Sequence, residues 1–134
     1  MAMVSDVRII TPEARFSAAY INIGLGGADM GSSYFLPRLI GAGRAYEFLL
    51  TSDFMGAEEA SKLGFVSRVV PYTELMPASL DIACKMTSKN PLGLRLTKEA
   101  INQNLDAHGL ENALQVEDRN QVACILSHRL KGNI

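Results

Sequence analysis

Hydrophobic and polar residues alternate near the start of the chain and again around residue 70. The segment "DVRII" (residues 6–10) alternates and is rich in β-branched residues, and "VSRVVP" (66–71) has the same character before a proline. Both patterns predict short strands. The turn sequence "TPE" separates the first strand from "ARFSA" (14–18), which predicts a further extended segment.

The apolar spacing becomes helical between these strands. It predicts helices over "MGSSYFLPRLI" (30–40), "GAGRAYEFLLTS" (41–52) and "MGAEEASKLGF" (55–65). Gly64 suits the left-handed residue that often follows the end of a helix, so we expect the third helix to stop there.

The second half of the chain has an almost wholly helical pattern. Apolar residues recur at helical spacing in 72–90 and in 91–109, which opens on a proline and closes on a glycine. The segment 110–132 has an apolar stripe opposite a charged face, which is more typical of a core or a subunit interface than of a ligand site. We therefore divide the chain into a mixed α/β region, residues 1–71, and a helical region, residues 72–134.

A glycine-rich stretch, "INIGLGGADMGSSYFLPRLIG" (21–41), joins the two kinds of pattern. Residues 21–23 resemble a strand, and glycines and one acid, Asp29, lead from there into a helix. We expect that helix to end at or just after Pro37, because proline removes a backbone donor inside a helix.

Three interpretations of this stretch remain open from the residues alone. A phosphate site is disfavoured, because the spacing "GLGGADMG" fits neither glycine pattern of such sites and the first lysine is Lys62. The glycines can instead let a helix pack closely on the preceding strand, with Asp29 as its N-cap. In the third interpretation they leave room for a flat acyl group, and Asp29 shuttles a proton.

Composition narrows the class of protein. The chain has 134 residues, is 48% hydrophobic and 20% charged, and carries a formal net charge of −1. These values suit a globular chain with a real core and give no basic block for nucleic acid. No apolar run is long enough to span a bilayer, and acidic residues and Arg8 early in the chain are unlike a signal peptide, so we expect no membrane partner.

The cysteines and histidines do not suggest a metal site. Cys84 and Cys124 lie in helix-like segments, and only His128, four residues after Cys124, stands at a ligand-like spacing from either. A buried cysteine beside an exposed histidine at the end of a helix explains that pair better. We expect reduced thiols and a cytosolic or organellar-matrix protein, with no metal.

An ordered string of short motifs carries a resemblance. From Asp6 to Pro71 the chain contains "DVRI", "ARF", "LPRLIG", "LLT" and "AEEASKLGFV…VVP" in that order. This string resembles the second half of the crotonase superfamily, the enoyl-CoA hydratases and isomerases of acyl-CoA and fatty acid metabolism, and the helical tail to about Ser127 agrees.

The resemblance implies a fold and a chemistry. The expected fold is α/β: the second half of a crotonase-type β-β-α spiral, followed by a helical region that joins subunits into trimers or hexamers. The expected substrates are acyl-CoA thioesters, with coenzyme A as part of the substrate and no separate cofactor. Two backbone N–H groups of an oxyanion hole would stabilise an enolate-like state, and carboxylates would move protons.

Departures from the family pattern limit these expectations. The second glutamate of the hydratases falls on Tyr20, and the first glutamate and the oxyanion-hole segments would fall before Met1. The regions that grip the coenzyme A nucleotide would also fall before Met1, and the closing basic helix would follow "SHRLKGNI". We therefore expect a partial crotonase fold that is inactive as a hydratase by itself. The alternatives are a non-catalytic assembly partner of full-length crotonase subunits and a functionless truncated product.

One acid matches a family motif. Asp29-Met30-Gly31 resembles the Asp-x-Gly that supplies a catalytic carboxylate in the dienoyl-CoA isomerases, at the same spacing to Gly41 but after a loop one residue longer. Asp29 is the candidate catalytic residue, with N-capping as its alternative. The resemblance also implies a set of residues that line the acyl pocket: Tyr20, Gly26, Gly27, Met30 and Gly31.

Overall fold

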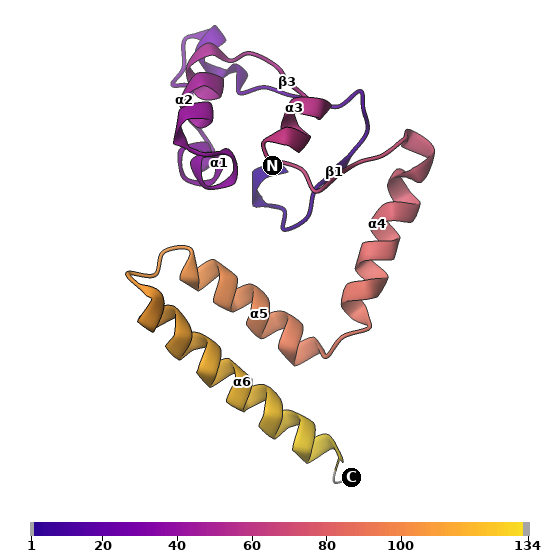
Figure 1. The fold of residues 1–134 in the computed structure, drawn as a ribbon. Coiled ribbons are helices and arrows are strands. Elements are labelled where there is room, and N and C mark those ends of the chain that lie inside the picture. Colours follow the sequence, from indigo (N-terminus) through magenta and orange to yellow (C-terminus); the bar gives the residue numbers. More distant parts are fainter. Residues whose placement is uncertain (1, 133–134) are drawn as a thin grey trace. The chain divides into compact units, whose positions relative to one another are not determined.

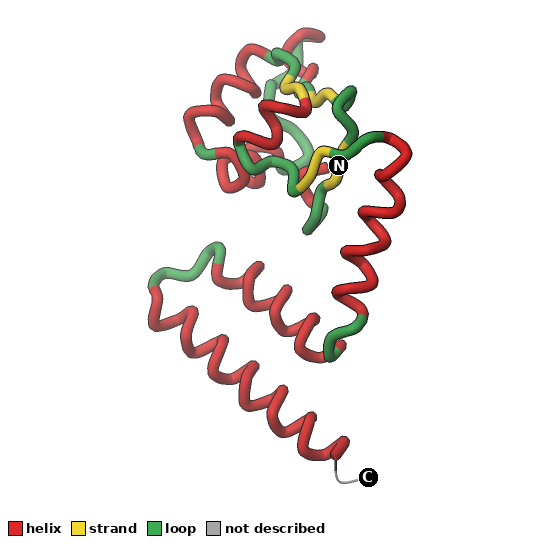
Figure 2. The backbone as a smooth tube through the Cα atoms, turned by 45° about the vertical axis from the view of Figure 1, so that its right-hand side comes forward, coloured by secondary structure: helices red, strands yellow, loops and turns green. Residues whose placement is uncertain are grey.

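The computed structural model describes residues 2–132, which form two compact units, one up to Leu80 and one from Asp81 onward. Helices dominate both units, and all short strands among the described residues lie in the first (Figures 1 and 2). Within the described residues, no helix combines the length and the apolar character that a membrane crossing requires.

The first unit is a mixed α/β structure with two small sheets. Strand β1 pairs in parallel with β4, with Ile9 opposite Arg68, and β2 pairs antiparallel with β3, with Arg15 opposite Gly56. The predicted extended segments 6–10, 14–18 and 66–71 are thus confirmed, although each contains a strand of only two residues. Its elements are η1 (Ala2–Val4), β1 (Ile9–Ile10), β2 (Arg15–Phe16), η2 (Ala19–Ile23), α1 (Ser32–Ile40), α2 (Ala42–Thr51), β3 (Met55–Gly56), α3 (Ala57–Lys62), β4 (Arg68–Val69) and the first part of α4 (Tyr72–Thr87).

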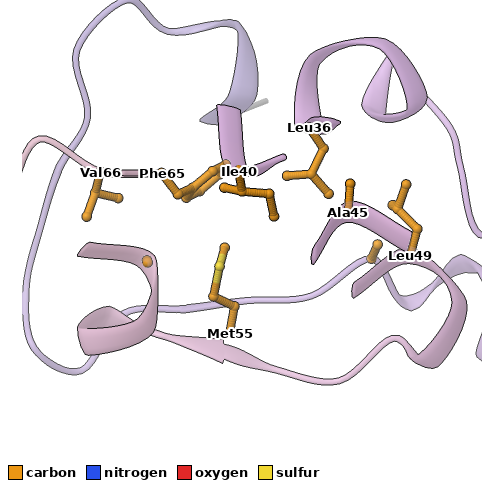
Figure 3. Packing of buried hydrophobic residues seen from close by; sticks show 9 residues of the cluster. Leu36, Ile40, Ala45, Leu49, Met55, Phe65 and Val66 are labelled. Atoms are coloured by element: carbon orange, nitrogen blue, oxygen red, sulfur yellow. The ribbon is translucent and has the colours of Figure 1, made fainter. Parts of the chain in front are cut away.

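The core of this unit is built from buried side chains of α1, α2 and α3 and of the segments next to the strands (Figure 3). Leu36, which is 1% exposed, and Ile40 stand four residues apart on α1 and so share one face of that helix. Burying a leucine side chain completely contributes about 1.5–3 kcal/mol, so this face holds α1 in place. The other members of the buried cluster are Ala18, Ala45, Leu49, Met55, Ala60, Phe65 and Val66.

Arg8 ties the first strand to the segment before β4. Its Nε donates to the carbonyl oxygen of Phe65, and its guanidinium carbon lies 5.3 Å from the centre of the Phe65 ring. Phe16 meets the same ring edge-on, with the centres 4.9 Å apart. Burial lowers the pKa of the Arg8 guanidinium below its usual value, and the nearby Asp6 opposes that shift.

Residues 21–23, expected as a strand, instead form the end of the 3-10 helix η2. Gly24 follows with φ of 80° and donates its N–H to Ile21, while Leu25 N–H bonds to the carbonyl oxygen of Tyr20. These local bonds occupy the carbonyl groups that a strand would offer to a neighbour. The β-branched residues therefore predicted the wrong element here.

One helix boundary agrees with the expectations and one differs. Helix α1 ends at Ile40, three residues after Pro37, as the predicted segment 30–40 implied, and its buried face extends to that residue. Residues 55 and 56, expected inside a helix, pair with β2 as strand β3 instead. Gly64 has φ of 72° directly after α3, as its position predicted.

The second unit contains the end of α4 and a helical hairpin of α5 (Pro91–Asn104) and α6 (Leu110–Gly132), which run side by side in opposite directions (Figure 1). Asn90 caps α5 by accepting the Leu92 N–H at 3.0 Å, and proline follows it at the first helical position, as predicted. Asn120 of α6 donates to the carbonyl oxygen of Leu96 at 3.3 Å and so fixes the two helices against each other.

Candidate functional site

All six candidate site residues lie in one connection, the segment from Ala18 to Gly31 between β2 and α1. Within it, Tyr20 is half-buried and packs against the core cluster of the first unit. Three apolar side chains of the same connection are uncovered instead: Ile23, Leu25 and Met30 are 74%, 59% and 62% exposed. The connection therefore has an anchored side and an apolar, uncovered side.

Gly27 anchors this connection to α2. A Cβ atom at this position would lie 2.2 Å from the carbonyl oxygen of Leu49 and 3.7 Å from the side chain of Ile21, so no other residue fits there without movement. Gly26, beside it, has no such neighbour within 4 Å. Close packing, one of the open interpretations of the glycines, thus applies to Gly27 and not to Gly26.

A group of polar side chains forms a second anchor. The side chain of Ser17 donates to the carbonyl oxygen of Ser52 at 3.0 Å, and Asn22 Nδ2 donates to the hydroxyl of Ser52 at 3.1 Å. Ser17 and Asn22 flank Tyr20, so both ends of residues 17–22, which we call the Tyr20 turn, are bonded to Ser52, the residue that follows α2. No local pattern in the sequence predicts this group, because its members are 30 and 35 residues apart along the chain.

Asp29 lies on the surface, and its carboxylate bonds within the loop. Its Oδ1 accepts the N–H of Met30 at 2.7 Å, while its own N–H donates to the hydroxyl of Ser32 at 3.0 Å. The N-cap of α1 is Gly31, and no side chain caps that helix end. The expectation that Asp29 caps the helix is therefore wrong, because its carboxylate is taken by the adjacent amide.

Met30 and Gly31 both have left-handed backbone conformations, with φ of 50° and 82°. This conformation is unfavourable for a residue with a side chain and costs Met30 about 1–2 kcal/mol. The bond from its amide to Asp29 helps to offset that cost, and the methionine side chain is exposed. At Gly31 a Cβ would also meet the Phe35 ring at 3.0 Å.

A separate small cavity of about 190 Å³ lies beside α2 and β3. None of the six candidate residues lines it, so it is distinct from the glycine-rich connection. Its walls are Ile40, Arg44, Glu47, Phe48, Thr51, Asp53, Phe54, Met55, Glu59 and Leu63.

The described residues offer no site for a metal ion. Across residues 2–132, no three or more His, Cys, Asp and Glu side chains come close enough together to hold one. Cys84 is exposed and Cys124 half-buried, and both thiols are free.

Comparison with known proteins identifies a single family. The profile of the enoyl-CoA hydratase/isomerase family matches residues 1–133. A probable enoyl-CoA hydratase of Mycobacterium tuberculosis, EchA12, is 42% identical over 122 residues, which are 91% of this chain and 43% of that protein. The chain thus spans less than half the length of this relative.

Solved structures agree with the sequence match. A probable enoyl-CoA hydratase/isomerase from Mycobacterium abscessus superposes with a TM-score of 0.89 at 37% identity, over 92% of this chain and 48% of that one. A putative enoyl-CoA hydratase from Thermobifida fusca, solved with acetoacetyl-CoA, gives 0.87 at 28% identity, over 93% and 48%. The expected fold, a partial crotonase-type spiral followed by a helical region, is confirmed.

Proposed function

Since the chain belongs to the enoyl-CoA hydratase/isomerase family, we propose that it binds acyl-CoA thioesters through the connection between β2 and α1. The reaction it serves is the hydration of, or a double-bond shift in, an enoyl-CoA through an enolate-like intermediate. The observation that carries this proposal is the uncovered apolar side of that connection, Ile23, Leu25 and Met30, in a chain that matches the family over residues 1–133.

The chemistry assigned to this site is proton transfer by Asp29. Its carboxylate is exposed beside Met30, and the bond from the Met30 amide to Oδ1 fixes its direction. A carboxylate held in this way can take a proton from one carbon of a bound enoyl group and return it to another, which shifts the double bond. Tyr20, Gly26, Gly27 and Gly31 shape the pocket around it.

Hydration needs more than these residues supply. Tyr20 cannot act as the carboxylate that the resemblance assigns to its position. The resemblance also places the oxyanion-hole donors outside these 134 residues, and the loss of one such donor costs a factor of about 10²–10³ in rate. We therefore propose that a polypeptide of these 134 residues alone has little or no hydratase activity on crotonyl-CoA. Loss of the enoyl absorbance of crotonyl-CoA measures this directly, and robust hydration by the pure polypeptide would contradict it.

Binding is tested separately from turnover. Calorimetric titration with acetoacetyl-CoA should show binding that Met30→Gln weakens by about threefold to tenfold, since a polar group then faces the acyl chain. Ser33→Gln, an exposed change on α1, is the matched control and should leave the affinity unchanged. Equal affinities for all three proteins would show that the connection does not meet the acyl group.

A second function, subunit assembly, is favoured by the helical hairpin. Large uncovered apolar side chains in one region mark protein–protein contacts more often than free surface. We propose that this hairpin joins copies of the chain, or full-length crotonase subunits, into trimers or hexamers in the cytosol. The exposed apolar residues of the hairpin are Leu94, Ile101, Leu105, Leu110, Leu114, Val122, Ile125, Leu126 and Leu130.

Light scattering after size-exclusion chromatography tests assembly. A mass of three or six subunits is expected, and Leu126→Asp should reduce it to one by placing a charge in the contact. Gln121→Asp, also an exposed charge on α6, is the control and should keep the larger mass. A single-subunit mass for the unchanged protein, with or without a full-length homologue, would contradict the assembly role.

A further inference from the structure

The residue after α2, Ser52, has a backbone conformation that a serine adopts at a cost. Its φ of 59° and ψ of 23° lie in the left-handed region, and Ser52 is only 5% exposed. Glycine adopts this conformation freely, and it is the residue most often found after a helix end. A serine here is therefore explained only if its hydroxyl does something that glycine cannot do.

The hydroxyl of Ser52 makes contacts on both sides of Tyr20. It accepts a hydrogen bond from Asn22 Nδ2 at 3.1 Å and lies 3.3 Å from the hydroxyl of Ser17. The carbonyl oxygen of Ser52 accepts a second bond from Ser17 at 3.0 Å. A glycine at residue 52 would keep this carbonyl bond and lose the contacts of the hydroxyl.

These contacts act on the part of the molecule that carries the candidate pocket. Asn22 belongs to η2, and the carbonyl groups of Tyr20 and Ile21 hold the amides of Leu25 and Gly24 at the start of the glycine-rich loop. A change in the placement of η2 therefore changes the placement of the loop. Gly27 lies against the backbone of Leu49 on α2, the helix that Ser52 follows. This contact limits the movement of the loop further along the chain.

We propose that Ser52 is a positioning residue, whose hydroxyl holds the Tyr20 turn and thereby the acyl-facing loop against the end of α2. This inference rests on the proposed function where it concerns the acyl group. The holding of the turn does not depend on that function, and the two parts are measured separately.

The variant Ser52→Gly removes the hydroxyl while it relieves the left-handed backbone. Amide hydrogen exchange in this variant should rise by about threefold to tenfold at Leu25 and Gly24, as expected for the loss of a hydrogen bond. The Leu63 amide, which bonds to Glu59 in α3, reports on the unit as a whole and should not exchange faster. Unchanged exchange at Leu25 and Gly24 would overturn the inference.

Two further variants separate a local effect from a general one. Ser52→Ala loses the hydroxyl and keeps the backbone cost, so exchange should rise at Leu25 and also at Leu63. Ser33→Ala removes an exposed serine hydroxyl from α1 and should change neither rate. If Ser52→Gly raised exchange equally at Leu63 and Leu25, Ser52 would stabilise the whole unit and the positioning role would be wrong.

Affinity measurements then test whether the position of the Tyr20 turn affects binding of the acyl group. The ratio of the affinities for acetoacetyl-CoA and for CoA isolates the acyl contribution, and it should fall severalfold in Ser52→Gly. A loosened turn with an unchanged ratio would leave the holding role in place and would contradict the placement of the acyl group in the proposed function.

Discussion

The backbone of Gly27 lies directly against the carbonyl oxygen of Leu49, so close that a Cβ atom at residue 27 would stand 2.2 Å from it. This contact joins the glycine-rich connection to the last turn of α2. Because the obstacle is backbone and not a flexible side chain, neither partner can yield without moving a main chain.

Gly27→Ala should therefore destabilise the first unit by about 1–3 kcal/mol, the usual cost of overpacking. Chemical denaturation followed by tyrosine fluorescence measures this, because all four tyrosines, at residues 20, 34, 46 and 72, precede residue 81. Gly26→Ala is the control and should change stability by no more than about 0.5 kcal/mol, since no atom lies within 4 Å of its Cβ. Equal stability of both variants would show that the close approach is absent in solution.

Leu36→Ala tests the core. Leu36 on α1 is 1% exposed and packs in the buried cluster of the first unit. Truncation therefore leaves a cavity and should cost about 2–5 kcal/mol in the same denaturation experiment. The same change at Leu50, which is 64% exposed, should cost less than about 0.5 kcal/mol. A loss at Leu36 no larger than at Leu50 would mean that α1 does not pack as described.

Two substitutions separate the charge of Asp29 from the hydrogen bond that its side chain accepts from the Met30 amide. Asp29→Asn keeps an oxygen that accepts the Met30 amide, so hydrogen exchange at Met30 should stay slow, whereas Asp29→Ala should release that amide. Wherever the protein shifts a double bond, both variants should slow the reaction by about 10²- to 10⁴-fold, because neither can carry the proton. A normal rate for Asp29→Asn would exclude Asp29 as the proton carrier.

The Glu58–Lys62 ion pair predicts a pH dependence. Its atoms lie 2.7 Å apart on α3, and the hydrogen bond from Lys62, followed by its charge, lowers the pKa of Glu58. In turn, the hydrogen bond to Glu58, followed by the charge of Glu58, raises the pKa of Lys62. The contribution of Glu58 to stability is thus complete above the ordinary carboxyl pKa and is lost as the pH falls through its lowered value.

An NMR titration of the Glu58 carboxyl carbon tests this assignment. Its midpoint should lie below that of an ordinary glutamate and should move upward in Lys62→Gln, while Lys89→Gln, an exposed charge removed elsewhere, should leave it in place. Because the pair is exposed, both substitutions should have little effect on unfolding. An unchanged midpoint in Lys62→Gln would show that the pair does not persist in solution.

The helices could be predicted from the sequence because their signals are local. The proline after Asn90 and the glycine at residue 64 mark helix ends through their own backbone preferences, and the structure has both as expected. The strands at residues 9–10 and 68–69 were also found, although neither their parallel pairing nor their short length could be inferred from alternation.

Other parts could not be predicted because they depend on distant residues. Ile21 and Ile23 have β-branched side chains, but this segment pairs with no strand among the described residues, and local bonds form η2 instead. Nothing in the sequence distinguishes Gly27 from Gly26, since only the position of Leu49 makes one of them necessary. The contacts of Ser52 with Ser17 and Asn22 were hidden for the same reason, and the roles of Ser52, of Asp29 and of the pocket residues stay predictions.

The most direct test of the central claim is an NMR titration of the labelled protein with acetoacetyl-CoA and, in parallel, with CoA. Amide signals from residues 20–31 should shift with acetoacetyl-CoA and much less with CoA, because only the former carries an acyl group. Shifts confined to the cavity beside α2 and β3, or none in residues 20–31 with either compound, would contradict an acyl site in this connection.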